Sequence, residues 1–328
     1  MKRFTQRALN FLRRHYLNAF GPAPKPLLRS DDADEISRVI YDHLMDDRPF
    51  MLTRFGSVEL RCAYTYLGMQ AGPSSWLSYI LGKSPIFWFE PHDIETMRTN
   101  AGFFSNTPEQ LELFGKRYYE DSKLIDVLGV WGPVDYAVED NVKDSYKANI
   151  VYLEPYFSSQ PWSRALAGKK VLVVHPFASL IERQYREHRA QLFADPNVLP
   201  EFELKTIQAV QSLGGESNGF ATWFDALKWM EEAIDQQDYD ICIIGCGAYG
   251  LPLAGHVKRM GKKAIHLGGA TQLLFGIKGN RWENPEYGLN EPGFPPGFYL
   301  KMFNEHWTRP GDNERPKTAE KVENACYW

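Results

Sequence analysis

Short apolar runs alternate with longer amphipathic stretches along most of the chain. The apolar runs predict strands at 49–53, 125–130, 149–153, 170–174, 202–207, 240–244 and 263–267. Stretches with apolar positions at helical spacing predict helices at 31–45, 59–69, 108–122, 161–167, 179–192, 219–236 and 249–260. This alternation predicts an α/β fold of the Rossmann type, in which a mostly parallel sheet carries helices on both faces.

The same pattern divides the chain into three parts. Residues 1–29 comprise a basic amphipathic helix and a stiff Gly-Pro-Ala-Pro-Lys-Pro linker at 21–26. Residues 30–285 form the Rossmann-like domain, and residues 286–328 form a C-terminal tail that ends in two aromatic residues. Within the domain, 72–106 has no clean period and is rich in aromatic residues, which predicts an irregular insertion that shapes a pocket.

The predicted helix in residues 1–20 has two distinct kinds of surface. Its apolar positions recur at helical spacing, and its basic residues occupy the other faces. The apolar set is Phe4, Ala8, Phe11, Leu12, Tyr16 and Phe20, and the basic set is Lys2, Arg3, Arg7, Arg13 and Arg14. Such a helix fits either of two positions: on an anionic membrane surface, or packed against its own domain or a partner subunit.

Composition narrows the class of protein. The 328 residues are 44% hydrophobic, so the chain can bury a large core, and it has no apolar run long enough to predict a membrane span. The formal net charge of −4 argues against a general nucleic-acid-binding protein. The four cysteines have neither paired nor zinc-site spacing, and the N-terminus lacks a signal-peptide pattern. We therefore expect a cytoplasmic protein, held at the inner face of the membrane if residues 1–20 bind lipid.

A glycine turn at 245–250 is the clearest chemical motif. Gly245, Gly247 and Gly250 follow a predicted strand and open a predicted helix, an arrangement that lets backbone N–H groups approach a phosphate. An NAD site would also require an acidic residue about 20 residues later, at the end of the next strand. That strand ends in His266 and a Gly-Gly pair, so the pattern favours a phosphate site over an NAD site. The alternative is that the glycines serve only close packing of the helix on the strand.

Three other predicted strands also end in residues suited to ligand binding. Arg54 and Glu59 flank a glycine after the first strand, and His175 follows the fourth. Lys278 and Arg281 lie in a glycine-rich stretch after the last strand. Because ligands of open α/β sheets bind at the carboxyl ends of the strands, we expect these residues to meet at one edge. Each has an alternative. Arg54 and Glu59 would form an ion pair that caps a helix, and His175 would be a buried core residue. Lys278 and Arg281 would be solvated charges.

Two of these stretches resemble motifs of a known family. Thr53-Arg-Phe-Gly-Ser-Val-Glu-Leu60 resembles the Arg-Phe-Gly-Asp-Gly-Glu signature of the GT-D-fold glycosyltransferases, and Gly268-Gly-Ala-Thr-Gln-Leu-Leu-Phe-Gly-Ile-Lys-Gly279 resembles their closing motif. The resemblance covers about residues 35–285 and implies a single Rossmann-like domain. It also implies transfer of a sugar from a nucleotide-diphosphate donor, commonly UDP-linked, to a glycan or lipid-linked acceptor in polysaccharide or glycoprotein assembly.

In that family the Asp-x-Glu of the signature is associated with a divalent metal on the donor diphosphate. Here Ser57 takes the place of the Asp, and Glu59 remains as the candidate ligand for Mn²⁺ or Mg²⁺. Either Glu59 holds a metal together with the diphosphate and Ser57, or cations such as Arg54 and Lys278 neutralise the diphosphate without metal. A third alternative is a donor site that is altered altogether.

The motifs assign expected roles to individual residues. Glu59 or His175 would act as the base of an inverting reaction, with Asp93 and Glu95 as further candidates. The donor would bind to Arg54, Gly56, Ser57, Gly245, Gly247, Gly250, Gln272 and Lys278. The insertion would line the acceptor side. Two other functions stay open: a nucleotide-dependent enzyme of NAD type, and a noncatalytic nucleotide- or sugar-binding module, which the replacement of the signature Asp keeps open.

Overall fold

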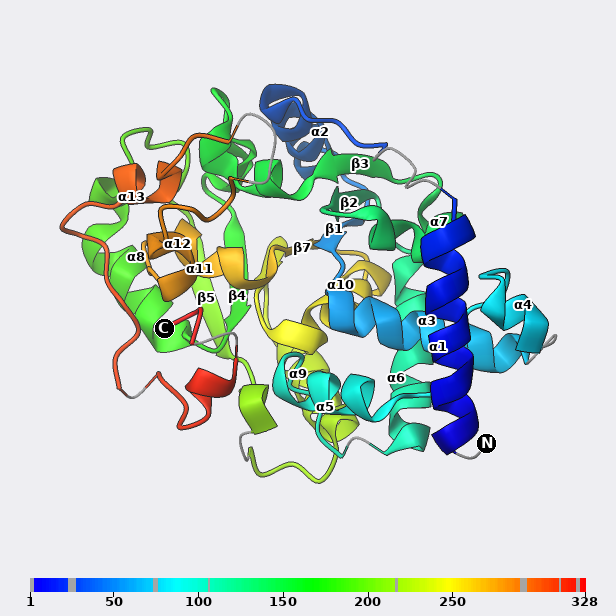
Figure 1. Cartoon of the computed structure of the whole chain (residues 1–328). Helices are drawn as coiled ribbons and strands as arrows, with labels where there is room; N and C mark the ends of the chain where they lie inside the picture. The colour runs from blue at the N-terminus through cyan, green and yellow to red at the C-terminus, as the bar shows by residue number, and fades with distance from the viewer. Residues whose placement is uncertain are drawn as a thin grey trace.

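The computed structural model describes residues 3–22, 28–72, 76–105, 107–215, 218–289, 294–312, 314–322 and 325–328. Within them, seven strands form one sheet in the order β3-β2-β1-β7-β6-β4-β5, and every neighbouring pair is parallel (Figure 1). The strands are β1 (Phe50–Arg54), β2 (Val127–Val130), β3 (Tyr146–Asn149), β4 (Lys170–His175), β5 (Glu203–Gln208), β6 (Ile241–Ile244) and β7 (Lys263–His266). This parallel sheet confirms the predicted α/β fold.

Side chains at the first turns set several of the helix starts. Asp32 accepts hydrogen bonds from the N–H groups of Asp34 and Glu35, both at 3.0 Å, and Thr222 and Asp225 form a capping box. The helices are α1 (Arg3–Phe20), α2 (Ala33–Met45), α3 (Ser57–Ala71), α4 (Trp76–Ile80), α5 (Pro91–Thr99), α6 (Pro108–Ser122), α7 (Glu139–Val142), α8 (Ala178–Leu192), α9 (Trp223–Asp235), α10 (Gly250–Arg259), α11 (Thr271–Leu274), α12 (Asn280–Glu283) and α13 (Phe298–Met302).

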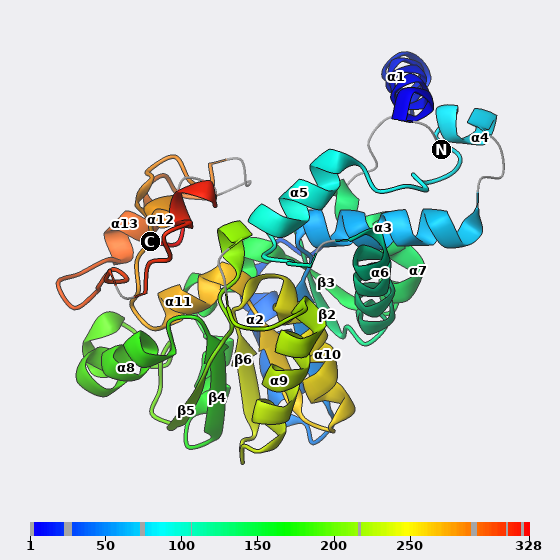
Figure 2. The same ribbon diagram turned by 90° about the horizontal axis from the view of Figure 1, so that it is seen from below.

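Helices cover both faces of the sheet, and side chains alternate between the faces along each strand (Figure 2). In β4, Val171 and Val173 pack into one core, while Leu172 and Val174 pack into the other. The first core includes side chains of α2, α8 and α11, and the second includes side chains of α3, α6, α9 and α10. Because both faces are buried, the central strands are continuously apolar, which is why short apolar runs located them.

Two predicted elements differ from the structure. The predicted strand at 149–153 is wrong, because β3 ends at Asn149 and Ile150–Leu153 form a 3₁₀ turn. The Asn149 side chain accepts a hydrogen bond from the N–H of Val151 at 3.0 Å, which turns the chain out of the sheet. The predicted helix at 161–167 is likewise a short 3₁₀ segment.

The insertion predicted at 72–106 is partly regular. It contains α4 and α5, and α5 begins with Pro91, whose fixed φ suits a first helical turn. Residues 73–75 and 106 of this segment lie outside the described residues, as do most of the predicted linker and several positions of the predicted tail.

A small lobe formed by α1 and α4 stands away from the sheet at the far end of α3 (Figure 2). Its own core consists of Leu9, Tyr79 and Trp88. None of the described helices is long and apolar enough to cross a membrane.

The C-terminal segment folds back onto the sheet rather than extending from it. Tyr299, Trp307 and Trp328 are buried in the first core. The Trp328 ring lies 6.3 Å from the Phe177 ring between their centroids, and its indole N–H donates to the carbonyl of Glu314 at 2.9 Å. The last residues of the chain therefore lie beside the carboxyl end of β4.

Candidate functional site

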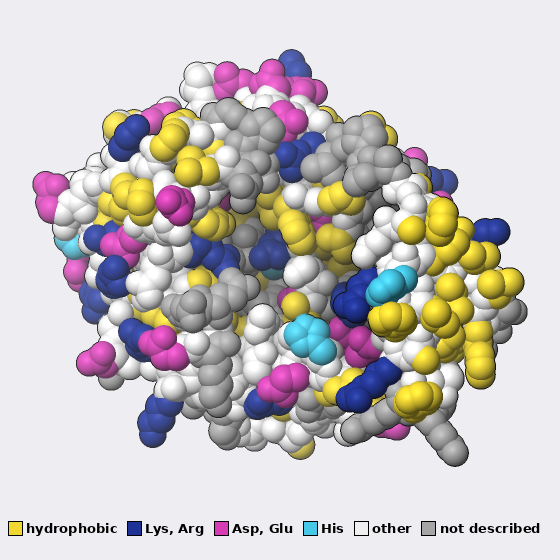
Figure 3. Space-filling model, viewed as in Figure 1, with side chains coloured by type: hydrophobic (Ala, Val, Ile, Leu, Met, Phe, Trp, Pro, Cys, Tyr) yellow, Lys and Arg dark blue, Asp and Glu magenta, His cyan; other side chains and the backbone are white. Residues whose placement is uncertain are grey.

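A pocket opens at the carboxyl ends of the four central strands. The strand-end residues in its wall are, in sheet order, Arg54, His266, Gly245 and His175. In the sheet, β2 lies on one side of β1, and β5 lies on the opposite side of β4. The chain therefore moves in opposite directions after these two strands, and the pocket lies where the strand order changes direction. Figure 3 shows the hollow near the centre of this face. The strand ends that the sequence predicted to meet do line one pocket.

The glycines of the turn after β6 are accounted for by packing and backbone conformation. A Cβ on Gly245 would lie 2.7 Å from the Gly268 carbonyl oxygen and 2.7 Å from a ring carbon of His175. A Cβ on Gly250 would lie 2.1 Å from Nε2 of His266, whereas Gly247 has room but adopts a φ of 55°. The close-packing alternative therefore explains Gly245 and Gly250.

The same turn leaves backbone N–H groups at the pocket. In the described part of the chain, no protein group accepts a hydrogen bond from the N–H groups of Cys246 and Gly247 ahead of α10, or of Ser57 and Val58 in the first turn of α3. The N–H of Gly56 donates to the Tyr118 hydroxyl at 3.2 Å. Two helices thus begin at the pocket, and their N-termini carry partial positive charge.

Arg54 supplies the formal positive charge of the pocket. It is the one Lys or Arg among the described residues that line it. One guanidinium nitrogen donates to the carbonyl of Phe55 at 2.8 Å, and Nε would lie 3.1 Å from a Cβ on Gly268. Gly268 has a φ of 62°, so this turn needs glycine both for its backbone and for its contact with Arg54.

Asp135 interacts electrostatically with Arg54 from a buried position after β2. One oxygen of its carboxylate accepts from the N–H groups of Trp131 and Gly132 at 2.7 and 3.1 Å, and the other has no hydrogen-bond partner among the described residues. Burial raises the pKa of Asp135 to about 6, and the two N–H groups, Arg54 and Arg29 oppose that rise. The carboxylate therefore contributes charge that favours the position of Arg54.

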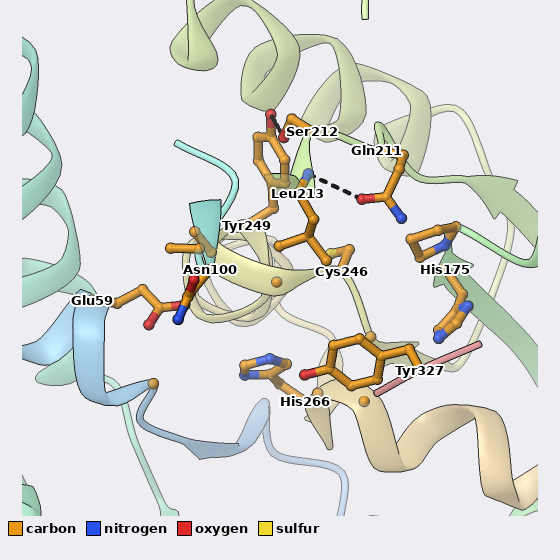
Figure 4. Close-up of a pocket in the computed structure, with 18 of the residues that line it drawn as sticks. Glu59, Asn100, His175, Gln211, Ser212, Leu213, Cys246, Tyr249, His266 and Tyr327 are labelled. Carbon is orange, nitrogen blue, oxygen red and sulfur yellow. Dashed lines mark hydrogen bonds between the residues drawn. The ribbon is translucent and has the colours of Figure 1, made fainter. Parts of the chain in front are cut away.

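His175 is buried in the wall on the side of the pocket opposite Glu59 (Figure 4). Its Nδ1 accepts a hydrogen bond from the N–H of Phe177 at 3.0 Å, which places the proton of the neutral ring on Nε2. Burial lowers the pKa of His175 to about 3, so the ring is neutral at physiological pH. A base needs a free lone pair, and this ring has none to offer, so the geometry favours a hydrogen-bond donor over the predicted base.

His266 is also held as a neutral imidazole. Its Nδ1 lies 2.8 Å from the Thr53 hydroxyl, and burial together with the nearby Arg54 lowers its pKa to about 3. Its other nitrogen packs against Gly250. The ring therefore locks the start of α10 against the ends of β1 and β7, and it carries no charge into the pocket.

Glu59 is the third residue of α3 and folds back over the start of the helix. Its carboxylate lies close to Gly56: a Cβ added to Gly56 would lie 2.1 Å from Oε2 of Glu59. Figure 4 shows the Glu59 carboxylate and the Asn100 amide turned towards each other on one side of the pocket. The partial positive charge of the helix N-terminus favours the ionised carboxylate in this position.

Besides Gly250, which does not line the pocket, two of the predicted donor-binding residues have side chains that serve the fold instead. Lys278 does not line the pocket: its ammonium lies 5.8 Å from the centroid of the Phe303 ring, and its backbone N–H donates to the Thr308 carbonyl at 2.7 Å. Gln272 does line the pocket, but its amide nitrogen donates to three backbone carbonyls, which include that of Tyr327 at 3.1 Å. Lys278 is therefore not placed to bind a donor in this pocket, and the Gln272 amide holds the C-terminal residues in place through Tyr327.

The remaining charged candidates lie outside the pocket. Asp93 forms an ion pair with Arg61 at 2.8 Å, and Glu95 forms one with Arg98 at 2.7 Å. Neither acid lines the pocket, so the proposal of these residues as alternative bases is not supported. Arg281 lies with its guanidinium 4.9 Å from the centroid of the Tyr327 ring.

Several lining residues were not found from the sequence. Tyr118 comes from the middle of α6, Asn100 follows α5, and Gln211 follows β5. Tyr327 covers the turn after β7, since a Cβ on Gly269 would lie 2.2 Å from its ring. The two terminal aromatic residues were the only sequence signal for this part of the wall, and nothing in the local pattern marks the other three.

The lining residues contain few metal ligands. Among the described side chains of the wall, Glu59 is the one carboxylate, and the Ser57 hydroxyl lies two residues before it. The described residues hold no group of three or more His, Cys, Asp or Glu side chains arranged around a metal position. Mg²⁺ and Mn²⁺ prefer several oxygen ligands. The residues present therefore do not fit a cation held by the protein alone.

Comparison of the chain with models of protein families, with curated proteins and with solved structures gives no match. Fold and pocket therefore define the class: a Rossmann-like α/β protein with a binding pocket at the carboxyl edge of a parallel sheet. Because one fold carries many activities, the activity has to be argued from the chemistry of the pocket itself.

The contact between Gly250 and His266 can be tested by mutation. Gly250→Ala should lower the free energy of unfolding by about 2 kcal/mol, because the added Cβ displaces the imidazole and its bond to Thr53. Urea denaturation measures this. The control is Gly132→Ala, where no atom lies within 4 Å of the added Cβ, and we expect a change below about 0.5 kcal/mol. Equal effects of the two substitutions would contradict the packing argument.

Proposed function

We propose that this protein is a glycosyltransferase that uses a nucleotide-diphosphate sugar, with UDP-sugars as the first candidates. The observation that carries the proposal is the meeting of the Arg54 guanidinium with the first turns of α3 and α10 in one pocket. A diphosphate needs hydrogen-bond donors and positive charge that approach closely without bulk. Backbone N–H groups and a planar guanidinium meet that need.

The donor side of the reaction is assigned to the neutral and cationic donors of the wall. Arg54 and the N–H groups of Cys246 and Gly247 would bind the diphosphate, and the Nε2–H of His175 would donate one further hydrogen bond. As the bond from the sugar to the diphosphate breaks, negative charge grows on the leaving group, and these fixed donors stabilise it. A neutral histidine is suited to this role because it donates without first having to take up a proton.

Glu59 is assigned the role of base. In a single displacement, the acceptor oxygen forms a bond to the anomeric carbon while the bond to the diphosphate breaks. The proton of the acceptor hydroxyl passes to the Glu59 carboxylate, and the nucleoside diphosphate leaves with its electron pair. Glu59 and His175 lie on opposite sides of the pocket, which allows one to face the acceptor and the other to face the leaving group (Figure 4).

A second groove provides an acceptor side. It meets the pocket at Ser57, which lines both, and it extends between α1, α3 and the segment after β2. Its aromatic lining includes Phe11, Tyr64, Tyr79 and Trp131. Aromatic rings with polar neighbours suit a glycan chain or the headgroup of a lipid-linked sugar. Residues 86, 90, 91 and 92 of the predicted insertion also line this groove, which supports the acceptor role expected for that segment.

An enzyme of NAD type is less well supported. In a dinucleotide fold, an acid at the end of the strand after the glycine turn holds the ribose hydroxyls. That position in β7 is His266, which burial keeps neutral. A noncatalytic binding module would use the same pocket, and sugar transfer by the parent protein separates the transferase from it.

Ligand binding tests the donor site. Thermal unfolding with UDP, GDP, CMP, NAD and NADP, each with and without Mn²⁺, should show stabilisation by a nucleoside diphosphate, of about 2.7 kcal/mol at 100 times its dissociation constant. Arg54→Ala should weaken that binding by about tenfold or more, because a charge-assisted pair is lost. Lys278→Ala is the control and should bind as the parent does. Stabilisation by NAD or NADP alone would contradict the proposal.

Turnover tests the assignment of Glu59. Glu59→Gln preserves the shape of the side chain but cannot accept a proton, so we expect the rate of sugar transfer to fall by about 100-fold or more. Nucleotide affinity should change little in the same variant. Full activity of Glu59→Gln would remove Glu59 from catalysis, and a parent protein that binds nucleotide but transfers no sugar to any acceptor would favour the binding module.

A further inference from the structure

The N-terminal helix α1 is attached to the protein through the buried Leu9 side chain and through polar contacts. Asn10 donates to the carboxylate of Glu90 and accepts from the Tyr79 hydroxyl. Arg13 donates to the backbone carbonyls of Tyr79 and Ser84, the latter at 2.8 Å, and stacks over the Tyr79 ring. These polar contacts, together with Leu9 packed against Tyr79 and Trp88, hold α1 in place, although other apolar residues of the helix do not take part.

Several large apolar side chains of α1 are exposed. Phe4 is 83% exposed, Phe11 is 53% exposed and Phe20 is 74% exposed. On the neighbouring α4, Trp76 and Leu77 are 57% and 62% exposed. Figure 3 shows hydrophobic side chains gathered over α1 and α4. Leaving several large apolar side chains in water on one lobe is unfavourable, so this surface is suited to a partner.

The charge of the lobe identifies the partner. Residues 3–22 and 76–89 contain four arginines and Lys83 and no Asp or Glu, although the whole chain has a formal net charge of −4. Glu90, the next residue along the chain, is engaged by the Asn10 amide. Arg7 and Arg14 are exposed on α1, on the flank of Phe11. Exposed aromatic residues beside arginine are typical of helices that lie in the interface of an anionic bilayer.

A second copy of the chain fits this surface less well. A two-fold contact places the same patch of both copies face to face. The exposed arginines of one lobe would then approach those of the other, with no acidic residue in either 3–22 or 76–89 to pair with them. Like charges at such a contact are destabilising.

We propose that α1 and α4 form a docking surface for an anionic lipid bilayer. The exposed aromatic side chains enter the headgroup region, and Arg7 and Arg14 pair with lipid phosphates. The lobe stands away from the sheet, so it can reach a membrane without disturbing the pocket (Figure 2). Arg7, Phe11 and Arg14 also line the second groove, so the docking surface borders the acceptor side of the proposed function. Vesicle binding is measured without any donor or acceptor, so the docking is tested independently of the transfer reaction.

Vesicle flotation of the full chain tests the proposal. The protein should float with vesicles of phosphatidylcholine mixed with phosphatidylglycerol, and it should bind vesicles of phosphatidylcholine alone about tenfold more weakly. High salt should reduce the binding to mixed vesicles. Phe4→Ser combined with Phe11→Ser should lower binding by about tenfold or more, and so should Arg7→Glu combined with Arg14→Glu.

The control replaces two exposed apolar residues elsewhere. Leu113 and Met260 are 52% and 53% exposed on α6 and at the end of α10, and the Leu113→Ser, Met260→Ser protein should bind vesicles as the parent does. Thermal unfolding verifies that each variant is folded. Absence of binding to mixed vesicles would overturn the proposal. So would a dimer, detected by sedimentation equilibrium, that the Phe4 and Phe11 substitutions convert to monomer without any vesicle binding by the parent.

Discussion

The site depends on one packing constraint: the turn after β6 lies between the ends of its two neighbouring strands with no room for side chains at two of its positions. Gly245 is enclosed by His175 from one side and by the Gly268 carbonyl from the other, and Gly250 lies beneath the imidazole of His266. This contact joins β4, β6 and β7 at their carboxyl ends. It also directs the start of α10 into the space where Arg54 and α3 arrive from β1.

Desolvation then determines the electrostatics of the pocket. Both histidines are buried, and burial lowers their pKa values to about 3, so neither adds charge at neutral pH. Burial disfavours the charged form of both rings. Positive potential therefore comes from Arg54 and from the helix N-termini, with Asp135 beside the guanidinium. Such fixed donors need little rearrangement when charge develops on a ligand.

The hydrophobic pattern located six of the seven strands of the described sheet and missed β3, which ends at Asn149, where the Asn149 side chain turns the chain out of the sheet. Strand-end reasoning found Arg54, Glu59 and the glycine turn because parallel strands share one carboxyl edge. The same argument wrongly placed Lys278 at the pocket, since the chain turns away from the pocket after α11. It could not find Tyr118, because a residue in the middle of a helix reaches the pocket only through the packing of α3 on α6.

Crystallography of the protein with bound UDP tests the central claim most directly. We expect the diphosphate to lie beside the Arg54 guanidinium, within hydrogen-bond distance of the backbone N–H groups of Cys246 and Gly247, with Glu59 left facing the acceptor side. A nucleotide whose diphosphate lies in the groove beside α1, or anywhere else away from Arg54, would contradict it.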